Sequence, residues 1–173
     1  SRRMKGEPLA YILESAPFLD FDLYINSHTL IPRPETELLV TETVRLCTRA
    51  FEPEAPIRIL DLGCGSANIS IGLCLRVPQV HVDALEKSQG ALLCAKQNIA
   101  KFDLRSRIEL HQCDFLKEGI DSIHEKYDFI VSNPPYVSTR DRTSLPKDVR
   151  REPEEALFAG EEGDEILKWI LDH

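Results

Sequence analysis

The sequence predicts an α/β domain built on a parallel sheet and preceded by a β-hairpin. Short apolar runs alternate with helical patterns from residue 57 onwards, and a glycine-rich turn joins the first run to the helix after it. Before residue 31, apolar residues alternate with polar ones. Repeated strand, helix, strand order favours parallel strands connected by helices. With 173 residues, the chain has the length of a single domain.

The hairpin is expected within residues 18–31. Phe21, Leu23 and Ile25 alternate with polar residues, and the pattern breaks at Asn26-Ser27 before apolar residues resume. We therefore expect two short strands with their turn near Asn26-Ser27.

An amphipathic helix is expected next, over residues 34–51. Pro34 suits a first helical turn, and acidic residues follow it directly. The apolar face of this helix contains Val40, Val44, Cys47 and Phe51. Glu35 and Glu37, with Arg33 before them, fit two roles equally well, contact with a substrate or stabilisation of the helix start.

A series of strands and helices follows. The expected strands are residues 57–62, 80–85, 107–111 and 127–131. The expected helices are residues 68–76, residues 88–102 with Ser88 as N-cap, and a short helix near 120–125.

The charge balance argues against a broad nucleic-acid surface. The chain has 21 Lys and Arg against 29 Asp and Glu, a net charge of −8. One local basic cluster could contact an acidic or RNA-bearing partner, but a solvated loop is the interpretation we favour. The cluster comprises Arg140, Arg142, Lys147, Arg150 and Arg151.

The five cysteines and five histidines show no metal-ligand or disulfide spacing. We expect reduced cysteines in a cytoplasmic compartment and no metal site. No segment reaches transmembrane length, and no signal pattern precedes the domain, so a soluble protein without membrane contact is expected.

The first strand runs into the glycine-rich loop "DLGCGSAN", which begins at Asp61. Gly63 and Gly65 would let the backbone approach a ligand at the carboxyl end of the sheet. Since no third glycine follows, the loop fits an uncharged or cationic nucleoside better than a pyrophosphate. The alternative is a tight turn without a ligand.

Acidic residues follow the next two strands. Asp83 and Glu86 compete as acceptors for two ribose hydroxyls, and Glu86 is favoured because it lies at the strand end. After the third strand, Asp114 could accept from an adenine amino group, or it could cap a turn. Phe115 could cover the face of the adenine ring or pack in the core, and the sequence fits these two roles about equally.

The fourth strand ends in "SNPPYVST". Pro134 restricts Asn133 to extended geometry, and Pro134 and Pro135 withhold two N–H donors. The Asn133 side-chain oxygen and the Pro134 carbonyl remain as two convergent acceptors, which suit both hydrogens of an NH₂ group. Tyr136 could pack across such a planar group. The nitrogen of such an NH₂ group is a poor nucleophile, because its lone pair is delocalised. Orienting this nitrogen towards a sulfonium methyl group would carry much of the reaction.

In this order, the glycine loop, Glu86, "CDF" and "NPPY" resemble class I S-adenosylmethionine-dependent methyltransferases that act on planar NH₂ groups. Adenine-N6 and protein-glutamine-N5 methyltransferases share "NPPY". The flanking segments "GEPLAYIL" (6–13), "LIPRPETELLV" (30–40) and "EPEEALFAGEEG" (152–163) resemble the release factor glutamine methyltransferase family.

The resemblance implies methylation of the glutamine in the Gly-Gly-Gln motif of class 1 peptide chain release factors, with S-adenosylhomocysteine as the other product. Asn133, Pro134 and Tyr136 would be catalytic and, with Pro135, would bind the substrate. The implied cofactor site comprises Gly63, Cys64, Gly65, Ser66, Ala67, Glu86, Asp114, Phe115 and Asn133. The implied location is the cytoplasm of a bacterial cell, or an organelle for a homologue there.

The chain departs from the family pattern in several places. Ala67 and Asn68 replace a glycine and a small residue, Glu86 replaces the commoner Asp, and Leu13-Glu14 lacks a glycine. We expect residues 1–33 to be a linker and hairpin, and residues 34–173 to be a catalytic domain that lacks its C-terminal strands. A fragment with an uncovered sheet edge would be unstable alone or would self-associate.

Two other functions remain open on the sequence. An adenine-N6 methyltransferase acting on nucleic acid fits "NPPY", but the net charge of −8 and the lack of a base-reading segment count against it. A non-catalytic fragment that binds S-adenosylmethionine is the other alternative. Glu152-Pro153 either closes over the site or forms an ordinary loop.

Overall fold

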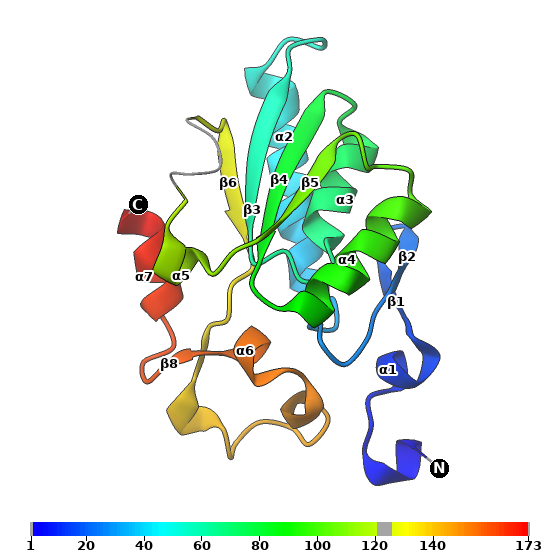
Figure 1. Ribbon diagram of the computed structural model, residues 1–173, viewed down its shortest axis with the longest axis vertical. Helices are drawn as coiled ribbons and strands as arrows, with labels where there is room; N and C mark the ends of the chain where they lie inside the picture. Colours follow the sequence, from blue (N-terminus) through cyan, green and yellow to red (C-terminus); the bar gives the residue numbers. More distant parts are fainter. Residues whose placement is uncertain (1, 121–125, 173) are drawn as a thin grey trace.

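The computed structural model of the protein describes residues 2–120 and 126–172. Its centre is a four-stranded parallel sheet with the strand order β5-β4-β3-β6 (Figure 1). The strands are β3 (Ile57–Leu62), β4 (Val80–Glu86), β5 (Ile108–Gln112) and β6 (Phe129–Ser132). All four predicted strands are confirmed, with small differences at their ends.

Three helices cover one face of this sheet. They are α2 (Pro34–Ala50), α3 (Asn68–Arg76) and α4 (Gln89–Lys101); in Figure 1, α2 lies behind the strands, and α3 and α4 lie to the right of β5. Their buried residues pack against alternate strand residues such as Ile59 and Val82. The predicted helices at 34–51, 68–76 and 88–102 are therefore confirmed.

The other face of the sheet carries a second, smaller core. Leu60, Leu62 and Leu85 point to this side and pack with residues of α5 (Phe115–Glu118) and α7 (Glu165–Asp172). Both short helices lie to one side of the sheet, away from α3 and α4 (Figure 1). The rings of Phe115 and Trp169 join them, with centroids 5.2 Å apart.

An antiparallel hairpin of β1 (Ser15–Phe18) and β2 (Phe21–Tyr24) precedes the sheet, after η1 (Arg3–Lys5) and α1 (Leu9–Leu13). The hairpin is confirmed, but the turn predicted at Asn26-Ser27 is wrong. The turn lies at Leu19-Asp20, where Leu19 adopts a left-handed φ of 55°. Its N–H donates to the Glu37 carboxylate of α2 at 2.9 Å, so a tertiary contact supports a turn that lacks glycine or asparagine.

The chain after β6 lies beyond the carboxyl ends of the strands (Figure 1). Its elements are β7 (Val137–Ser138), η2 (Thr139–Asp141), η3 (Val149–Arg151), α6 (Glu154–Leu157) and β8 (Phe158–Gly160). β7 and β8 pair in parallel. The segment therefore folds back over the edge where the predicted ligand site lies.

The short helix expected near 120–125 falls, from residue 121 on, outside the described residues. Among the residues that are described, no helix has both the length and the apolar character needed to cross a membrane. All five cysteines are buried free thiols, as expected.

Candidate active site

The carboxyl ends of all four parallel strands meet around one cavity. Because parallel strands end at the same edge, residues far apart in the sequence converge there. The predicted residues that line this cavity are Gly63, Gly65, Glu86, Asp114, Phe115, Asn133, Pro134 and Pro135. Cys64 and Ser66 line an adjoining small cavity, which also includes Asn133.

The glycine-rich loop turns sharply between β3 and α3. Gly63 and Gly65 have φ angles of 73° and 56°, which favour glycine. The N–H groups of Gly63 and Cys64 both donate to the Leu85 carbonyl, at 2.9 Å each. Ala67 is fully buried at φ 63°, so it lies behind the loop in a conformation that a glycine would adopt without strain.

Glu86 lies beside this loop at the end of β4. Its carboxylate accepts from the N–H of Gly65 at 3.0 Å and from the N–H of Ser88 at 2.8 Å. Burial raises the pKa of Glu86 above its ordinary value. The backbone bonds fix both carboxylate oxygens at the cavity wall, and each keeps acceptor capacity for a hydroxyl group.

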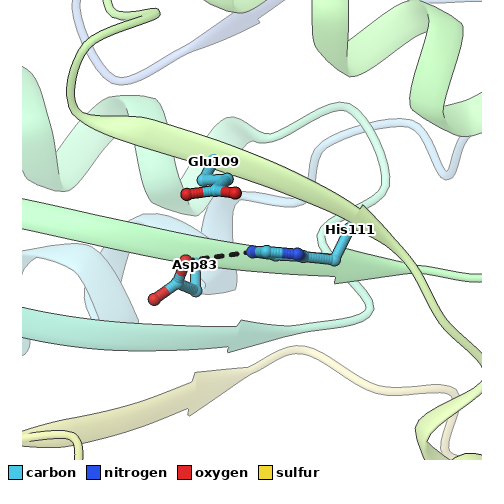
Figure 2. Close-up of side chains that lie close together, drawn as sticks. All are labelled: Asp83, Glu109 and His111. Carbon is cyan, nitrogen blue, oxygen red and sulfur yellow. Dashed lines mark hydrogen bonds and ion pairs between the residues drawn. The ribbon is translucent and has the colours of Figure 1, made fainter. Parts of the chain in front are cut away.

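Glu86 lines the cavity, whereas Asp83 does not. Figure 2 shows Asp83 on the sheet face with Glu109 and His111. Its carboxylate lies 3.0 Å from the His111 ring nitrogen and accepts from the Tyr127 hydroxyl at 3.1 Å. Ligand atoms of the three residues in Figure 2 lie within 4.8 Å of one another, but both Asp83 oxygens are already engaged. These hydrogen bonds account for the positions of Asp83 and His111.

Asp61, the first residue of the glycine-rich loop, was not among the predicted site residues, and it lines neither of the two cavities above. It is fully buried under the glycine-rich loop, and one oxygen accepts from the Ser70 hydroxyl at 2.5 Å. The other oxygen has no hydrogen-bond partner among the described residues. Burial raises the pKa of Asp61 to about 6. A positive charge nearby would stabilise a buried carboxylate with an unused oxygen. The available sequence signal was the place of Asp61 at the start of the loop.

Asp114 and Phe115 line the same cavity from the end of β5. The Asp114 carboxylate pairs with Lys117 at 2.8 Å, while its backbone N–H donates to Glu118. Phe115 is 9% exposed and packs against Trp169, so it belongs to the small core and to the cavity wall. The core position of Phe115 is therefore confirmed, and its contact with an adenine ring stays a prediction.

Asn133 lies where three hollows meet. It lines the cavity at the strand ends, which we call the inner cavity, the small cavity beside the glycine-rich loop, which we call the small loop cavity, and a third, outer cavity. The outer cavity is lined by Arg33, Glu35, Thr36, Leu39, Asn133 and Tyr136. The Asn133 nitrogen donates to the Thr36 hydroxyl at 3.1 Å, which leaves its side-chain oxygen unengaged by that contact.

Tyr136 is 59% exposed and lies at the outer cavity, not at the inner one. Arg33 and Glu35 line that same outer cavity, and Glu35 and Glu37 also lie in the first turn of α2. The Glu37 carboxylate accepts a hydrogen bond from the hairpin, and Glu37 does not line the outer cavity. Its role is therefore structural.

Glu152 connects the segment after β6 to the start of α2. Its side chain is 2% exposed, and it accepts from the Ile31 N–H at 3.0 Å and from Arg33 at 2.5 Å. In the basic cluster, Arg140 pairs with Glu161 and Glu162, and Arg142 pairs with Glu154. These internal pairs support the solvated-loop interpretation for both arginines.

The strand order, the glycine-rich loop, the acid after β4 and the Asn-Pro-Pro-Tyr segment after β6 define the fold of class I S-adenosylmethionine-dependent methyltransferases. Residues 40–161 match the family model described as "Methyltransferase small domain". The chain belongs to that family.

Curated proteins similar to this chain are more specific than the family model. The chain is 34% identical over 171 residues to the release factor glutamine methyltransferase of Rhodopirellula baltica, covering 98% of this chain and 57% of that protein. It is 36% identical over 172 residues to the enzyme of the same name from Salmonella typhimurium, covering 99% and 59%. The chain thus spans just under three fifths of the length of these relatives.

Solved structures support the fold. The catalytic domain of human METTL16, in complex with a 3′UTR hairpin, matches with a TM-score of 0.66 at 19% identity, covering 87% of this chain and 55% of that one. The N-terminal domain of human METTL16 in complex with S-adenosylhomocysteine matches with a TM-score of 0.53 at 21% identity, covering 68% and 47%.

Proposed function

We propose that this chain transfers a methyl group from S-adenosylmethionine to the side-chain amide nitrogen of the glutamine in the Gly-Gly-Gln motif of class 1 release factors. The observation that carries the proposal is the position of Asn133 between the inner and outer cavities, with Pro134 beside it. Similarity to release factor glutamine methyltransferases over nearly the whole chain supports glutamine as the target.

The residues of the inner cavity fit the proposed cofactor. Glu86 offers a fixed carboxylate for the ribose hydroxyls, and Phe115 offers a ring for the adenine face. Asp61 is fully buried and lies outside the cavity lining, and a positive charge on a bound ligand would stabilise its ionised form. When bound, the cofactor supplies an activated sulfonium methyl group. S-adenosylhomocysteine would be the product.

The outer cavity fits an amide that enters from the protein surface. A glutamine nitrogen has a delocalised lone pair, so it must be oriented before it can react. The Asn133 oxygen and the Pro134 carbonyl would accept its two hydrogens, and Tyr136 would cover the planar group. The sulfur–methyl bond would break as the nitrogen–methyl bond forms. The alkylated nitrogen, now acidic, would release its proton to water, so this arrangement needs no general base.

A methyl-transfer assay tests the proposal. Labelled S-adenosylmethionine is incubated with the protein and a class 1 release factor, with a release factor whose motif glutamine is replaced by alanine, or with an RNA hairpin. We expect label only in the unaltered release factor. Label in the RNA would favour an adenine methyltransferase, and binding of the cofactor without transfer to any substrate would favour a non-catalytic fragment.

A further inference from the structure

The two ends of the Asn133 side chain have nearly the same shape but opposite hydrogen-bonding character. An oxygen that faces the substrate would accept from an NH₂ group, whereas a nitrogen in that place would present a second donor. The proposed reaction therefore requires one of the two amide orientations. The Pro134 and Pro135 nitrogens carry no hydrogen, so the adjoining backbone offers no N–H at these positions to hold the amide.

The Thr36 hydroxyl contacts the end of the amide that must point away from the substrate. Its oxygen lies 3.1 Å from the Asn133 nitrogen, which donates to it. Thr36 is 5% exposed, so water has little access to compete for this bond. Both residues line the small loop cavity and the outer cavity, so the bond lies at the boundary between the cofactor side and the substrate side.

Other threonines of α2 show that this contact is not the usual one for a helical threonine. Thr41, Thr43 and Thr48 each donate to the carbonyl four residues earlier, at 2.8 to 3.0 Å. The residue four positions before Thr36 is Pro32, which precedes the start of α2. Thr36 therefore lies in the first helical turn, where its hydroxyl faces another segment.

The start of α2 is a rigid support for this hydroxyl. Pro34 occupies the first turn, Glu37 accepts from the N–H of Leu19 at 2.9 Å, and Arg33 pairs with the buried Glu152. These contacts join the first turn of α2 to the hairpin and to the segment after β6. A hydroxyl on such a support holds the plane of the Asn133 amide.

We propose that Thr36 is a positioning residue, which holds the side-chain amide of Asn133 with its oxygen towards the substrate nitrogen. This inference rests on the proposed function and adds a second residue to it. Thr36 acts through Asn133 and makes no contact with the reacting atoms.

Three variants separate this role from simple packing. Thr36→Val keeps the shape but removes the acceptor, Thr36→Ser keeps the acceptor, and Thr43→Val is the matched control. Thr43 is likewise 5% exposed on α2, but its hydroxyl bonds its own helix. We expect Thr36→Val to lower kcat about tenfold with little change in cofactor affinity, because one positioning hydrogen bond is lost. Thr36→Ser and Thr43→Val should remain close to the wild type.

The side-chain amide resonances of Asn133, observed by NMR without substrate, test the contact independently of turnover. They should shift in Thr36→Val and stay in place in Thr43→Val. Equal kcat for Thr36→Val and Thr43→Val, an equal loss in Thr36→Ser, or unmoved Asn133 resonances would overturn the inference. If Thr36→Val does not fold, Thr36→Ala provides the same comparison. If Thr36→Val shifts the Asn133 resonances but the wild type transfers no methyl group, the contact is supported and the proposed function is contradicted.

Discussion

Asn133 is the residue on which the proposed chemistry depends most. It reaches both cavities, and its nitrogen is held by Thr36. Asn133→Ala should lower kcat by about 100-fold to 1,000-fold, the size of loss seen when one aligned polar group is removed from a reaction centre. Calorimetry should show cofactor affinity changed only a few-fold. Equal losses in turnover and in cofactor affinity would instead indicate a structural role.

Asp61 predicts a pH dependence of stability. Its pKa is raised to about 6 by burial, so the ionised form destabilises the folded protein. This cost is fully present above pH 6 and disappears as the pH falls below about 4, the ordinary pKa of the unfolded chain. Between these values the folded state binds more protons, so the contribution of Asp61 to the free energy of unfolding rises as the pH falls.

Asp61→Asn isolates this contribution from other titrating groups. The difference in free energy of unfolding between the variant and the wild type should favour the variant more at pH 8 than at pH 4, by about 2–3 kcal/mol. Urea unfolding at a series of pH values measures it. A difference that stays constant across this range would show that Asp61 has an ordinary pKa in the folded protein.

At the scale of elements, Glu152 joins the segment after β6 to the start of α2. The Glu152 side chain is 2% exposed and that of Arg33 is 29% exposed, so loss of the carboxylate leaves the partly buried Ile31 N–H without this acceptor. Glu152→Ala should lower the free energy of unfolding by roughly 2 kcal/mol, and Glu152→Gln by less, because the amide oxygen can still accept from Ile31. Denaturant unfolding measures both.

Glu154→Ala is the control for that prediction. Glu154 lies two residues along the same segment and pairs with Arg142, but both side chains are exposed. An exposed ion pair contributes little to stability, so the unfolding midpoint should not move. Equal effects of Glu152→Ala and Glu154→Ala would contradict a special role for the buried pair.

The elements show what could be predicted from sequence and what could not. The strands and long helices follow from apolar runs and helical periodicity, which are local properties. The turn at Leu19-Asp20 has only Asp20 as a local turn residue, and its further support comes from Glu37, which is distant in the sequence. The Thr36–Asn133 contact joins residues 97 positions apart, and the Arg33–Glu152 pair joins residues 119 apart. Neither contact can be inferred from spacing.

At the scale of the whole molecule, convergence of the site was predictable because parallel strands end at one edge of the sheet. Residues of the glycine-rich loop, Glu86 and the Asn133-Pro134-Pro135 segment therefore meet around one cavity. The burial of Asp61 and its unused oxygen depend on how α3 packs over β3, which needs the three-dimensional arrangement.

The edge of the sheet at β6 leads to a prediction about self-association. Among the described strands, β6 pairs only with β3, and Ile130 on β6 is 45% exposed. We propose that this apolar edge pairs with another copy. The mass measured by sedimentation should then rise with concentration, and Ile130→Lys should suppress the rise, because a charge on an edge strand opposes pairing. A cooperative melt with a monomeric mass at every concentration would contradict this.

The central claim is that an amide nitrogen, held at Asn133, receives the methyl group. Peptide mass spectrometry tests this claim most directly, because it identifies the residue that carries the methyl group. The sample is a release factor incubated with the protein and S-adenosylmethionine. The predicted result is a single added methyl group on the glutamine side chain of the Gly-Gly-Gln motif, lost in Asn133→Ala. A methyl group on any other residue, or an unmodified motif glutamine although the cofactor binds, would contradict it.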